Sequence, residues 1–164
     1  MAKGLDIETV DLTIPEGCSI ILGQSHFIKT VEDLYEIIIT SNPKAEFGIA
    51  FSEASGPRLI RRDGTDQELT DIAIKNIMAI SAGHCFLIML KNVFPISVLN
   101  QVKQCQEVVN IFAATSNPVK VLVARDNEHA AILGVMDGFS PLGVETVDNA
   151  RERMKFLRNI GYKR

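Results

Sequence analysis

The sequence predicts a single α/β domain, because short apolar runs typical of strands alternate with stretches of helical periodicity. The runs at residues 47–51 and 85–90 are bounded by turn residues, as buried strands are. Residues 66–80 instead place their apolar side chains on one helical face. The 164 residues suffice for one domain with a sizeable core, and the sequence contains no internal repeat or linker. We therefore treat residues 1–164 as one domain.

The first third of the chain is predicted to form two strands and a helix. Residues 5–12 alternate loosely and residues 18–22 are apolar, so we expect these segments to pair as a hairpin. Thr30 is expected to cap a helix that ends at residues 41–43. The apolar stripe of that helix consists of Val31, Leu34, Tyr35 and Ile38.

The middle of the chain is predicted to continue with a strand, a polar turn and a second helix. Residues 47–51 form the strand, and Leu59 and Ile60 suit a short returning strand. Residues 65–68 have a capping-box pattern that begins a helix, and Gly83 suits its C-terminal end. Residues 85–90 are predicted to be a strand buried on both faces.

The last third is predicted to contain a helix, three strands and a final helix. Pro95 suits the first turn of a helix. Apolar runs predict strands at residues 108–114, 119–124 and 130–135. The final helix begins near Thr146 and is expected to bury Val147, Ala150, Met154 and Leu157.

The composition is that of an ordinary soluble protein and excludes several functional classes. A net charge of −3 gives no basic field for nucleic acid or an anionic membrane. No signal peptide is expected, and the longest apolar run is too short to span a bilayer, so we expect a cytoplasmic protein. The three cysteines have no CxxC spacing, which favours reduced, buried thiols.

The common nucleotide and metal motifs are missing from the sequence. It contains no GxxxxGK[ST] or GxGxxG phosphate loop and no GxSxG nucleophile elbow. No set of histidines and cysteines has zinc-ligand spacing, so no metal site is expected. Any nucleotide site must therefore be of an unusual kind.

The strongest local signal for a ligand is the polar turn after residues 47–51. Small polar residues and an arginine cluster follow the strand there, and a new helix begins directly after them. Arginine holds phosphate bidentately and a helix N-terminus offers unpaired N–H donors, so this stretch suits a phosphate-bearing ligand. The alternative is a solvated hairpin with surface arginines.

Polar residues also follow the other predicted strands. His26 and Lys29 come after one strand, Lys91 and Asn92 after another, and Asn117 and Asp137 after two more. In open α/β sheets, ligands bind where strands give way to loops at their C-terminal ends. If these ends converge, they form one site. The alternative is that strand ends are simply polar, and that His26 is a structural histidine.

Five stretches in this order resemble the adenosine-specific kinase family. They are GQSHFIKTVEDLYE, FSEASGPRLIRRDG, AGHCFLIMLKNVFPISVLN, TSNPVKVLVA and ILGVMDGFSPLGVE. The resemblance extends from about residue 5 to residue 164 and has no broken motif. These are small proteins, mostly from archaea and thermophilic bacteria.

This resemblance implies a three-layer α/β/α-type sandwich with a mixed sheet and a homo-oligomer, with a trimer as one option. It also implies binding of adenosine or AMP, and phosphoryl transfer from ATP to adenosine with Mg²⁺. Two alternatives remain open. One is a non-catalytic AMP sensor, and the other is a hydrolase or phosphotransferase for another nucleotide that uses His26 as acid or base.

Chemistry then assigns expected roles to individual residues. Glu53 either holds Mg²⁺ or takes a proton from the attacking hydroxyl, or it merely orients an arginine. His26 is the second candidate acid or base. Phosphate, hydroxyl, ribose and base contacts are expected from Lys29, Ser55, Gly56, Arg58, Arg61, Lys91, Asn92, Asn117 and Asp137, and adenine stacking from Phe94 or Phe139.

The oligomer is expected for an independent reason as well. The helix at residues 30–40 carries Ile37, Ile38 and Ile39 in succession. Leu34 and Tyr35 precede them, and one helix face cannot bury all five against a single sheet. The helix is therefore either buried on two sides within the monomer or contacts another subunit, and we favour the contact.

Overall fold

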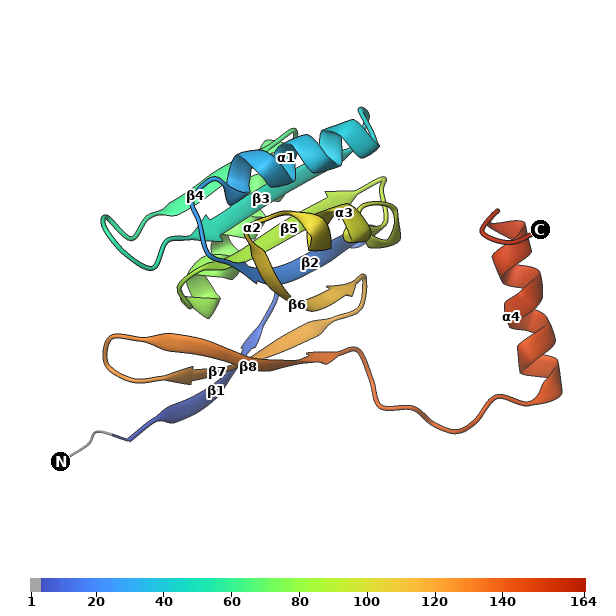
Figure 1. The fold of residues 1–164 in the computed structure, drawn as a ribbon. Helices are drawn as coiled ribbons and strands as arrows, with labels where there is room; N and C mark the ends of the chain where they lie inside the picture. Colours follow the sequence, from blue (N-terminus) through green and yellow to red (C-terminus); the bar gives the residue numbers. More distant parts are fainter. Residues whose placement is uncertain (1–3) are drawn as a thin grey trace.

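The computed structural model describes residues 4–164, which form eight strands in two antiparallel sheets together with four α-helices (Figure 1). The α/β class is therefore confirmed. The larger sheet has the order β4-β3-β5-β2-β6 and the smaller β1-β7-β8. The strands are β1 (Asp6–Asp11), β2 (Cys18–Ser25), β3 (Glu46–Ser52), β4 (Ile60–Gly64), β5 (Cys85–Lys91), β6 (Val108–Thr115), β7 (Val119–Arg125) and β8 (Ala130–Asp137).

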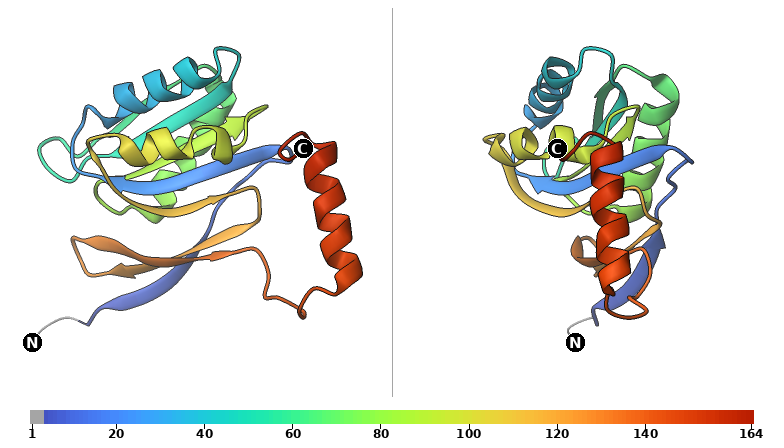
Figure 2. Two further views of the ribbon diagram at one scale, coloured as in Figure 1. Left: turned by 45° about the vertical axis from the view of Figure 1, so that its right-hand side comes forward. Right: turned by 90° about the vertical axis from the view of Figure 1, so that its right-hand side faces the viewer.

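The elements form three layers around the five-stranded sheet (Figures 1 and 2). Helices α1 (Thr30–Ser41) and α3 (Leu99–Gln104) cover one face. Helix α2 (Gln67–Ile80) and the three-stranded sheet cover the other face. The expected three-layer arrangement is thus confirmed, with a small sheet added to one of the helical layers.

Strand β5 shows why the core has two halves. Its apolar residues alternate between the faces of the sheet, as the period of two in a strand requires. Leu87 and Met89 lie in the core under α2, whereas Phe86 and Ile88 lie in the core under α1. The central position predicted from this uninterrupted apolar run is confirmed.

The topology corrects two expectations about strand pairing. Strand β1 pairs with β7 and not with β2, so the predicted N-terminal hairpin is wrong. Every pairing within residues 4–164 is antiparallel, so the sheets are not mixed. The reason is that β5 lies between β2 and β3 and pairs antiparallel with both, so these two parallel strands never touch. Strands that are hydrogen-bonded neighbours therefore end at opposite ends of their sheet, whereas β2 and β3 end at the same one.

The ends of the central helices differ slightly from the prediction. The side chain of Asp66 accepts a hydrogen bond from the N–H of Leu69 and caps α2, one residue later than the predicted capping box of residues 65–68 requires. The Thr65 hydroxyl instead donates to the carbonyl of Ala45. The helix ends at Ile80, and Ser81, rather than Gly83, adopts the left-handed conformation with φ 52°. Pro95 begins only a short 3-10 turn, η1 (Pro95–Ser97), and α3 starts later, at Leu99.

Helix α1 packs its apolar residues largely within its own chain. Ile38 is fully buried, and Ile37 and Ile39 are half-buried against the same core. The succession of isoleucines in α1 therefore does not by itself require a second subunit.

The C-terminal helix α4 (Val147–Asn159) begins where the sequence predicts, with a complete capping box at Thr146. The expected burial of its apolar stripe is wrong, since each of its residues is exposed or half-buried. The helix stands away from the body at the end of an extended segment (Figures 1 and 2). We call residues 138–164, which comprise this segment, α4 and the chain end, the arm.

The structure also bears on the cysteines and on membrane insertion. All three cysteines are free and buried, which confirms the expectation of reduced core thiols. Among the helices of residues 4–164, none combines the length and hydropathy that crossing a bilayer requires.

Candidate functional site

The main candidate site is a cleft of about 720 Å³ at one end of the five-stranded sheet. Strands β2 and β3 end there, β5 begins there, and the turn between β7 and β8 closes the far side. We call it the polar cleft, because most of its lining is polar. The side chains that bear on its chemistry are Gln24, Glu53, Arg58, His84, Glu128 and His129.

Backbone strain is concentrated around the polar cleft. Within residues 4–164, four non-glycine residues have left-handed φ angles, and three of them line this cleft. They are Arg58 at 52°, Ser81 at 52° and His84 at 60°. Such conformations cost free energy for side chains with a Cβ and tend to collect at functional sites.

Glu53 anchors the turn of residues 53–59 that forms one wall. Its Oε1 accepts hydrogen bonds from Arg61 Nε at 2.9 Å and pairs with Arg61 Nη2 at 2.7 Å. Its Oε2 accepts the N–H of Leu59 at 2.8 Å. The Leu59 N–H and the Arg61 guanidinium lower the pKa of Glu53. Both carboxylate oxygens are therefore engaged, and the group is a poor proton acceptor.

Arg58 is the cation of this turn that remains available to a ligand. Its backbone N–H bonds weakly to the carbonyl of Ser55 at 3.4 Å. Arg58 lines the cleft, and its guanidinium forms no ion pair with any residue of the described chain. A guanidinium in this position suits a phosphate group. Ser55 and Gly56 belong to the same turn.

His84 also lines the polar cleft. Its backbone N–H donates to the Ser52 carbonyl at 2.7 Å, and its backbone carbonyl accepts from the Ser25 N–H at 2.9 Å. These bonds hold it between the ends of two strands. Its ring stacks on Phe51, with centroids 5.9 Å apart and planes inclined by 16°. The residue was absent from the site predicted from sequence, although its position between Gly83 and a buried strand was a usable signal.

The turn between β7 and β8 lines the same cleft as His84. Asp126 accepts hydrogen bonds from the N–H groups of Glu128 and His129 and contacts the His129 ring. These N–H groups lower the pKa of Asp126. Glu128 and His129 are thus part of a hydrogen-bonded turn. Sequence reasoning missed them, because nothing local shows that this hairpin reaches the ends of β2 and β3.

The remaining predicted site residues lie elsewhere, beginning with His26 and Lys29. They follow β2 on the side toward β6, outside the lining of the cleft. Lys29 forms ion pairs with Asp33 and with the buried Glu107. Hydrogen bonds to these two carboxylates raise the pKa of Lys29.

Lys91 and Asn92 lie at the opposite end of the sheet, because β5 runs antiparallel to β2 and β3. Lys91 pairs with Glu46 at 3.2 Å. The Asn92 amide bridges two backbone groups, accepting from Glu46 N–H and donating to Lys44 O, both at 3.3 Å. Both residues connect the start of β3 to the end of β5.

Asn117 and Asp137 also lie away from the cleft and bind each other. Asn117 Nδ2 donates to Asp137 Oδ1 at 2.9 Å, and the Thr115 hydroxyl donates to the same oxygen at 2.8 Å. Phe94 lies near the C-terminal end of the arm, and Phe139 is fully exposed on the arm. The predicted site residues therefore do not form one site. Those of the 53–61 segment lie in or next to the polar cleft, and the others lie elsewhere.

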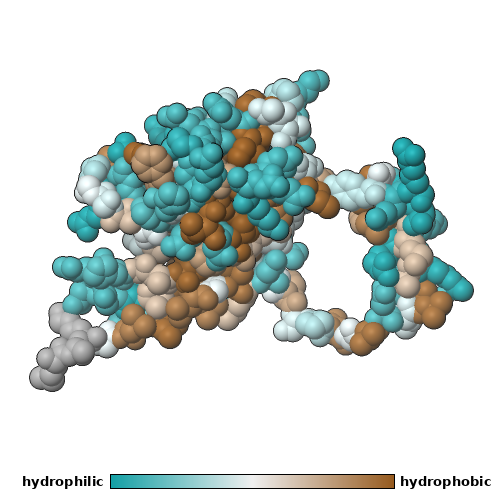
Figure 3. Space-filling model, viewed as in Figure 1, coloured by the Kyte–Doolittle hydropathy of each residue, from teal (hydrophilic) through white to brown (hydrophobic). Residues whose placement is uncertain are grey.

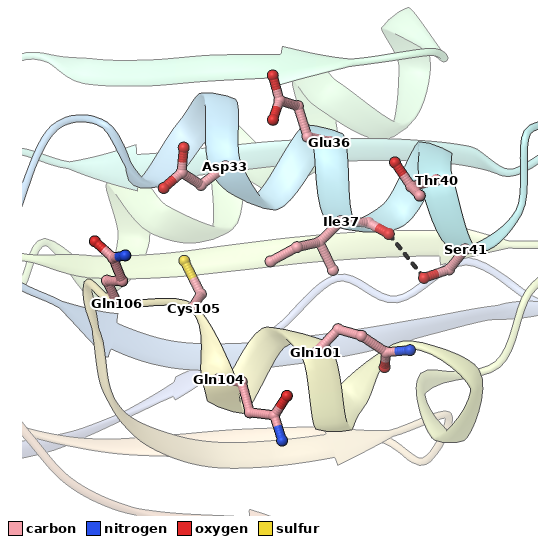
Figure 4. Close-up of a pocket in the computed structure, with 9 residues that line it drawn as sticks. All are labelled: Asp33, Glu36, Ile37, Thr40, Ser41, Gln101, Gln104, Cys105 and Gln106. Atoms are coloured by element: carbon pink, nitrogen blue, oxygen red, sulfur yellow. Dashed lines mark hydrogen bonds between the residues drawn. The ribbon is translucent and has the colours of Figure 1, made fainter.

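A second cluster lies beside a groove of about 630 Å³ between α1 and α3 (Figure 4). Ligand atoms of Asp33, Cys105 and Glu107 lie within 4.8 Å of one another. Burial alone would raise the pKa of Glu107, but hydrogen bonds from Cys105 and Lys29 outweigh it and lower that pKa to about 2. Lys29 already neutralises both carboxylates, so a metal ion would have to displace it.

Two comparisons with known proteins give matches that cover nearly the whole chain. A sequence model of the family described as "Adenosine specific kinase" matches residues 10–163. The crystal structure of the PH1918 protein from Pyrococcus horikoshii OT3 is similar, with 42% identity and a TM-score of 0.94. That match covers 98% of this chain and 99% of the other. Comparison with curated proteins gives no match.

Proposed function

This chain belongs to the adenosine specific kinase family, and on that basis we propose that it binds adenosine or AMP in the polar cleft. We further propose that it transfers a phosphoryl group from ATP to a ribose hydroxyl of adenosine. The observation that carries the proposal is the cleft itself, which is lined by three non-glycine residues with left-handed φ angles, among them the unpaired Arg58 and the imidazole-bearing His84.

Phosphate binding falls to Arg58 in this proposal. Its guanidinium offers two parallel N–H donors to phosphate oxygens, and the left-handed backbone at this position fixes where the side chain starts. Arg61 lies on β4, outside the lining of the cleft, and its guanidinium pairs with Glu53. The adenine is proposed to lie nearer Gln24, since a glutamine amide can donate to and accept from the adenine edge at once.

Phosphoryl transfer requires few covalent steps from the protein. The ribose oxygen forms a bond to the γ-phosphorus of ATP, the bond from that phosphorus to the bridging oxygen breaks, and ADP leaves. The hydroxyl proton passes to a base. His84 suits this role better than Glu53, because both oxygens of Glu53 already accept hydrogen bonds and its pKa is lowered.

Magnesium would be needed to neutralise the phosphates of ATP. Mg²⁺ is usually held by one or two carboxylates and by the substrate phosphates. Among the described residues that line the cleft, Glu128 has a carboxylate that is not engaged in an ion pair. The donor set thus fits a Mg²⁺ ion that reaches the cleft together with ATP.

A non-catalytic AMP sensor is the second candidate, and one observation favours it. Glu53, the carboxylate nearest the arginines, orients Arg61 instead of facing a ligand. That arrangement serves binding and leaves this carboxylate without a catalytic role. The third alternative, a nucleotide hydrolase that uses His26, has less support because His26 lies outside the cleft lining.

Calorimetric titration with AMP, adenosine, GMP and ADP tests the binding proposal. We expect AMP to bind and GMP to bind far more weakly. Arg58→Ala should weaken AMP binding about tenfold or more, whereas Arg62→Ala, an exposed arginine on the adjoining β4, should leave it unchanged. Equal affinity for GMP and AMP, or no heat with any of the four, would overturn the proposal.

A second assay separates the kinase from the sensor. Release of ADP from ATP is followed with adenosine as acceptor in the presence of Mg²⁺. Adenosine-dependent release supports the kinase. AMP binding without adenosine-dependent release supports the sensor.

A further inference from the structure

The arm is the part of the chain whose apolar side chains are least covered. The extended segment before α4 carries Phe139, Leu142 and Val144, all almost fully exposed. Helix α4 adds Val147 and Met154, which are also exposed. Figure 3 shows the arm apart from the body, with an opening between them. Apolar side chains gathered on one segment in this way mark a surface that binds another protein surface.

An isolated helix of this length is not stable in water without a partner. Helix α4 has 13 residues, and helices shorter than about 12–15 residues are marginal on their own. Its ends are nevertheless well formed, with a complete capping box at Thr146. The match to the PH1918 crystal structure extends over nearly the whole chain and therefore spans the arm. Its own body approaches it at the C-terminal end, so the rest of the helix requires tertiary contacts from elsewhere.

The arm cannot reach the exposed sheet of its own chain while it keeps its present contacts. At its C-terminal end Phe156, Ile160 and Tyr162 face Phe94 and Ile96 across an apolar cavity of about 430 Å³. At its other end it continues directly from β8. The arm is thus held at both ends, and the helix is kept away from the body between them (Figure 2).

A second uncovered apolar surface lies on the three-stranded sheet. Its inner face packs on the core through Val119, Val121 and Val123. Its outer face is open to solvent and carries Ile7, Leu133 and Met136, all exposed. The lower part of Figure 3, over β7 and β8, shows hydrophobic residues gathered on the surface.

The charges of the arm and of the rest of the chain are opposite in sign. Residues 138–164 contain six basic and three acidic residues, a net charge of +3. Residues 1–137 contain 11 basic and 17 acidic residues, a net charge of −6. An arm of one copy is therefore attracted to the body of another, and this complementarity favours a second copy as the partner.

We propose that the arm of each chain docks on the outer face of the β1-β7-β8 sheet of a second copy. The exposed apolar residues of the arm then cover Ile7, Leu133 and Met136 of the other chain. Each chain carries both surfaces, so the contact can be reciprocal within a pair or continue around a ring. This inference concerns assembly and does not depend on the proposed adenosine site.

Three matched substitutions of exposed methionines test the proposal on the full chain. Met154→Glu places a charge on the arm, where Met154 is 49% exposed. Met136→Glu does so on the sheet face, where Met136 is 48% exposed. Met78→Glu is the control, since Met78 lies on α2, belongs to neither surface and is 63% exposed. Sedimentation or light scattering then gives the mass over a range of concentrations.

We expect the wild type to have a multiple of the 18.1 kDa chain mass. Met154→Glu and Met136→Glu should each weaken association about tenfold or more, and Met78→Glu should not. A mixture of the two dissociated variants should regain a species of twice the chain mass, because the intact arm of one meets the intact face of the other. A wild-type monomer at all concentrations, unchanged association in both variants, equal dissociation by Met78→Glu, or no complementation would overturn the proposal.

Discussion

The carboxylate of Glu53, which lines the polar cleft, holds the guanidinium of Arg61, with Nη2 2.7 Å and Nε 2.9 Å from the same oxygen. The second carboxylate oxygen closes the turn by accepting the Leu59 N–H at 2.8 Å. One side chain thus fixes both the turn that presents Arg58 and the arginine behind it. Glu53 is better suited to shaping the anion site than to accepting a proton.

Glu53→Gln tests this interpretation. The neutral amide keeps one acceptor but loses the ion pair, so Arg61 is released and the 53–59 turn loosens. We expect AMP affinity to fall about tenfold, although removing a negative charge near a phosphate would by itself raise it. Calorimetric titration with AMP measures the change.

Glu16→Gln is the matched control for this substitution, because Glu16 lies exposed in the turn before β2. It should leave AMP affinity unchanged. Unchanged or tighter AMP binding by Glu53→Gln, combined with a large loss of turnover, would instead assign Glu53 a catalytic role.

Ser81→Gly should stabilise the protein. Ser81 caps α2 with φ 52°, a conformation that glycine adopts without the cost borne by a Cβ. We expect the free energy of unfolding to rise by about 0.5–1 kcal/mol. Chemical denaturation measures it.

Ser97→Gly is the control for Ser81→Gly, since Ser97 does not have a left-handed φ and belongs to η1. It should be neutral or destabilising. A loss of stability in Ser81→Gly would show that the Ser81 side chain contributes more than its backbone strain costs.

Local sequence patterns were sufficient to predict most elements but not how they pair. The continuous apolar run of β5 predicts a central strand, since covering both faces requires both sets of side chains to be apolar. Nothing in the run specifies the direction of its neighbours. The antiparallel pairing of β5 with β2 and β3 separates Lys91 from Glu53, although both follow strands. The candidate site was therefore predicted at the 53–61 segment and missed at His84 and His129.

The arm shows a different limit of sequence patterns. Val147 and Met154 have the spacing of a buried helical face, and that spacing correctly predicts an amphipathic helix. The pattern indicates that a face requires cover, but not whether the cover comes from the same chain. The left-handed φ of His84 could not be predicted from local sequence either, because it goes with tertiary hydrogen bonds to Ser52 and Ser25.

Because of Glu107, the free energy of unfolding should decrease at acidic pH. Its pKa is lowered from 4.5 to about 2, so the folded state favours the ionised form more than the unfolded state does. Its contribution is complete above the unfolded pKa and is lost as the pH falls from 4.5 toward 2. We expect unfolding measured at a series of pH values to show this loss.

Glu107→Gln provides the comparison for the acid dependence. It removes the titrating group and leaves Lys29 paired with Asp33. The variant should be less stable than the wild type at neutral pH, and the difference should shrink as the pH falls through this range. A constant difference at every pH would show that the ion pair with Lys29 does not produce the effect.

His84 provides the last prediction, which separates catalysis from binding. Asparagine is the substitution of choice, because it tolerates the left-handed φ of 60° and cannot take up a proton as imidazole does. If His84 accepts the ribose proton, His84→Asn should lower adenosine-dependent ADP release about a hundredfold and leave AMP affinity unchanged. His129→Asn is the matched control, since that imidazole lines the same cleft from an exposed turn. Parallel loss of turnover and AMP binding in His84→Asn, with the fold intact by circular dichroism, would make His84 a binding residue, and an equal loss in His129→Asn would remove its special role.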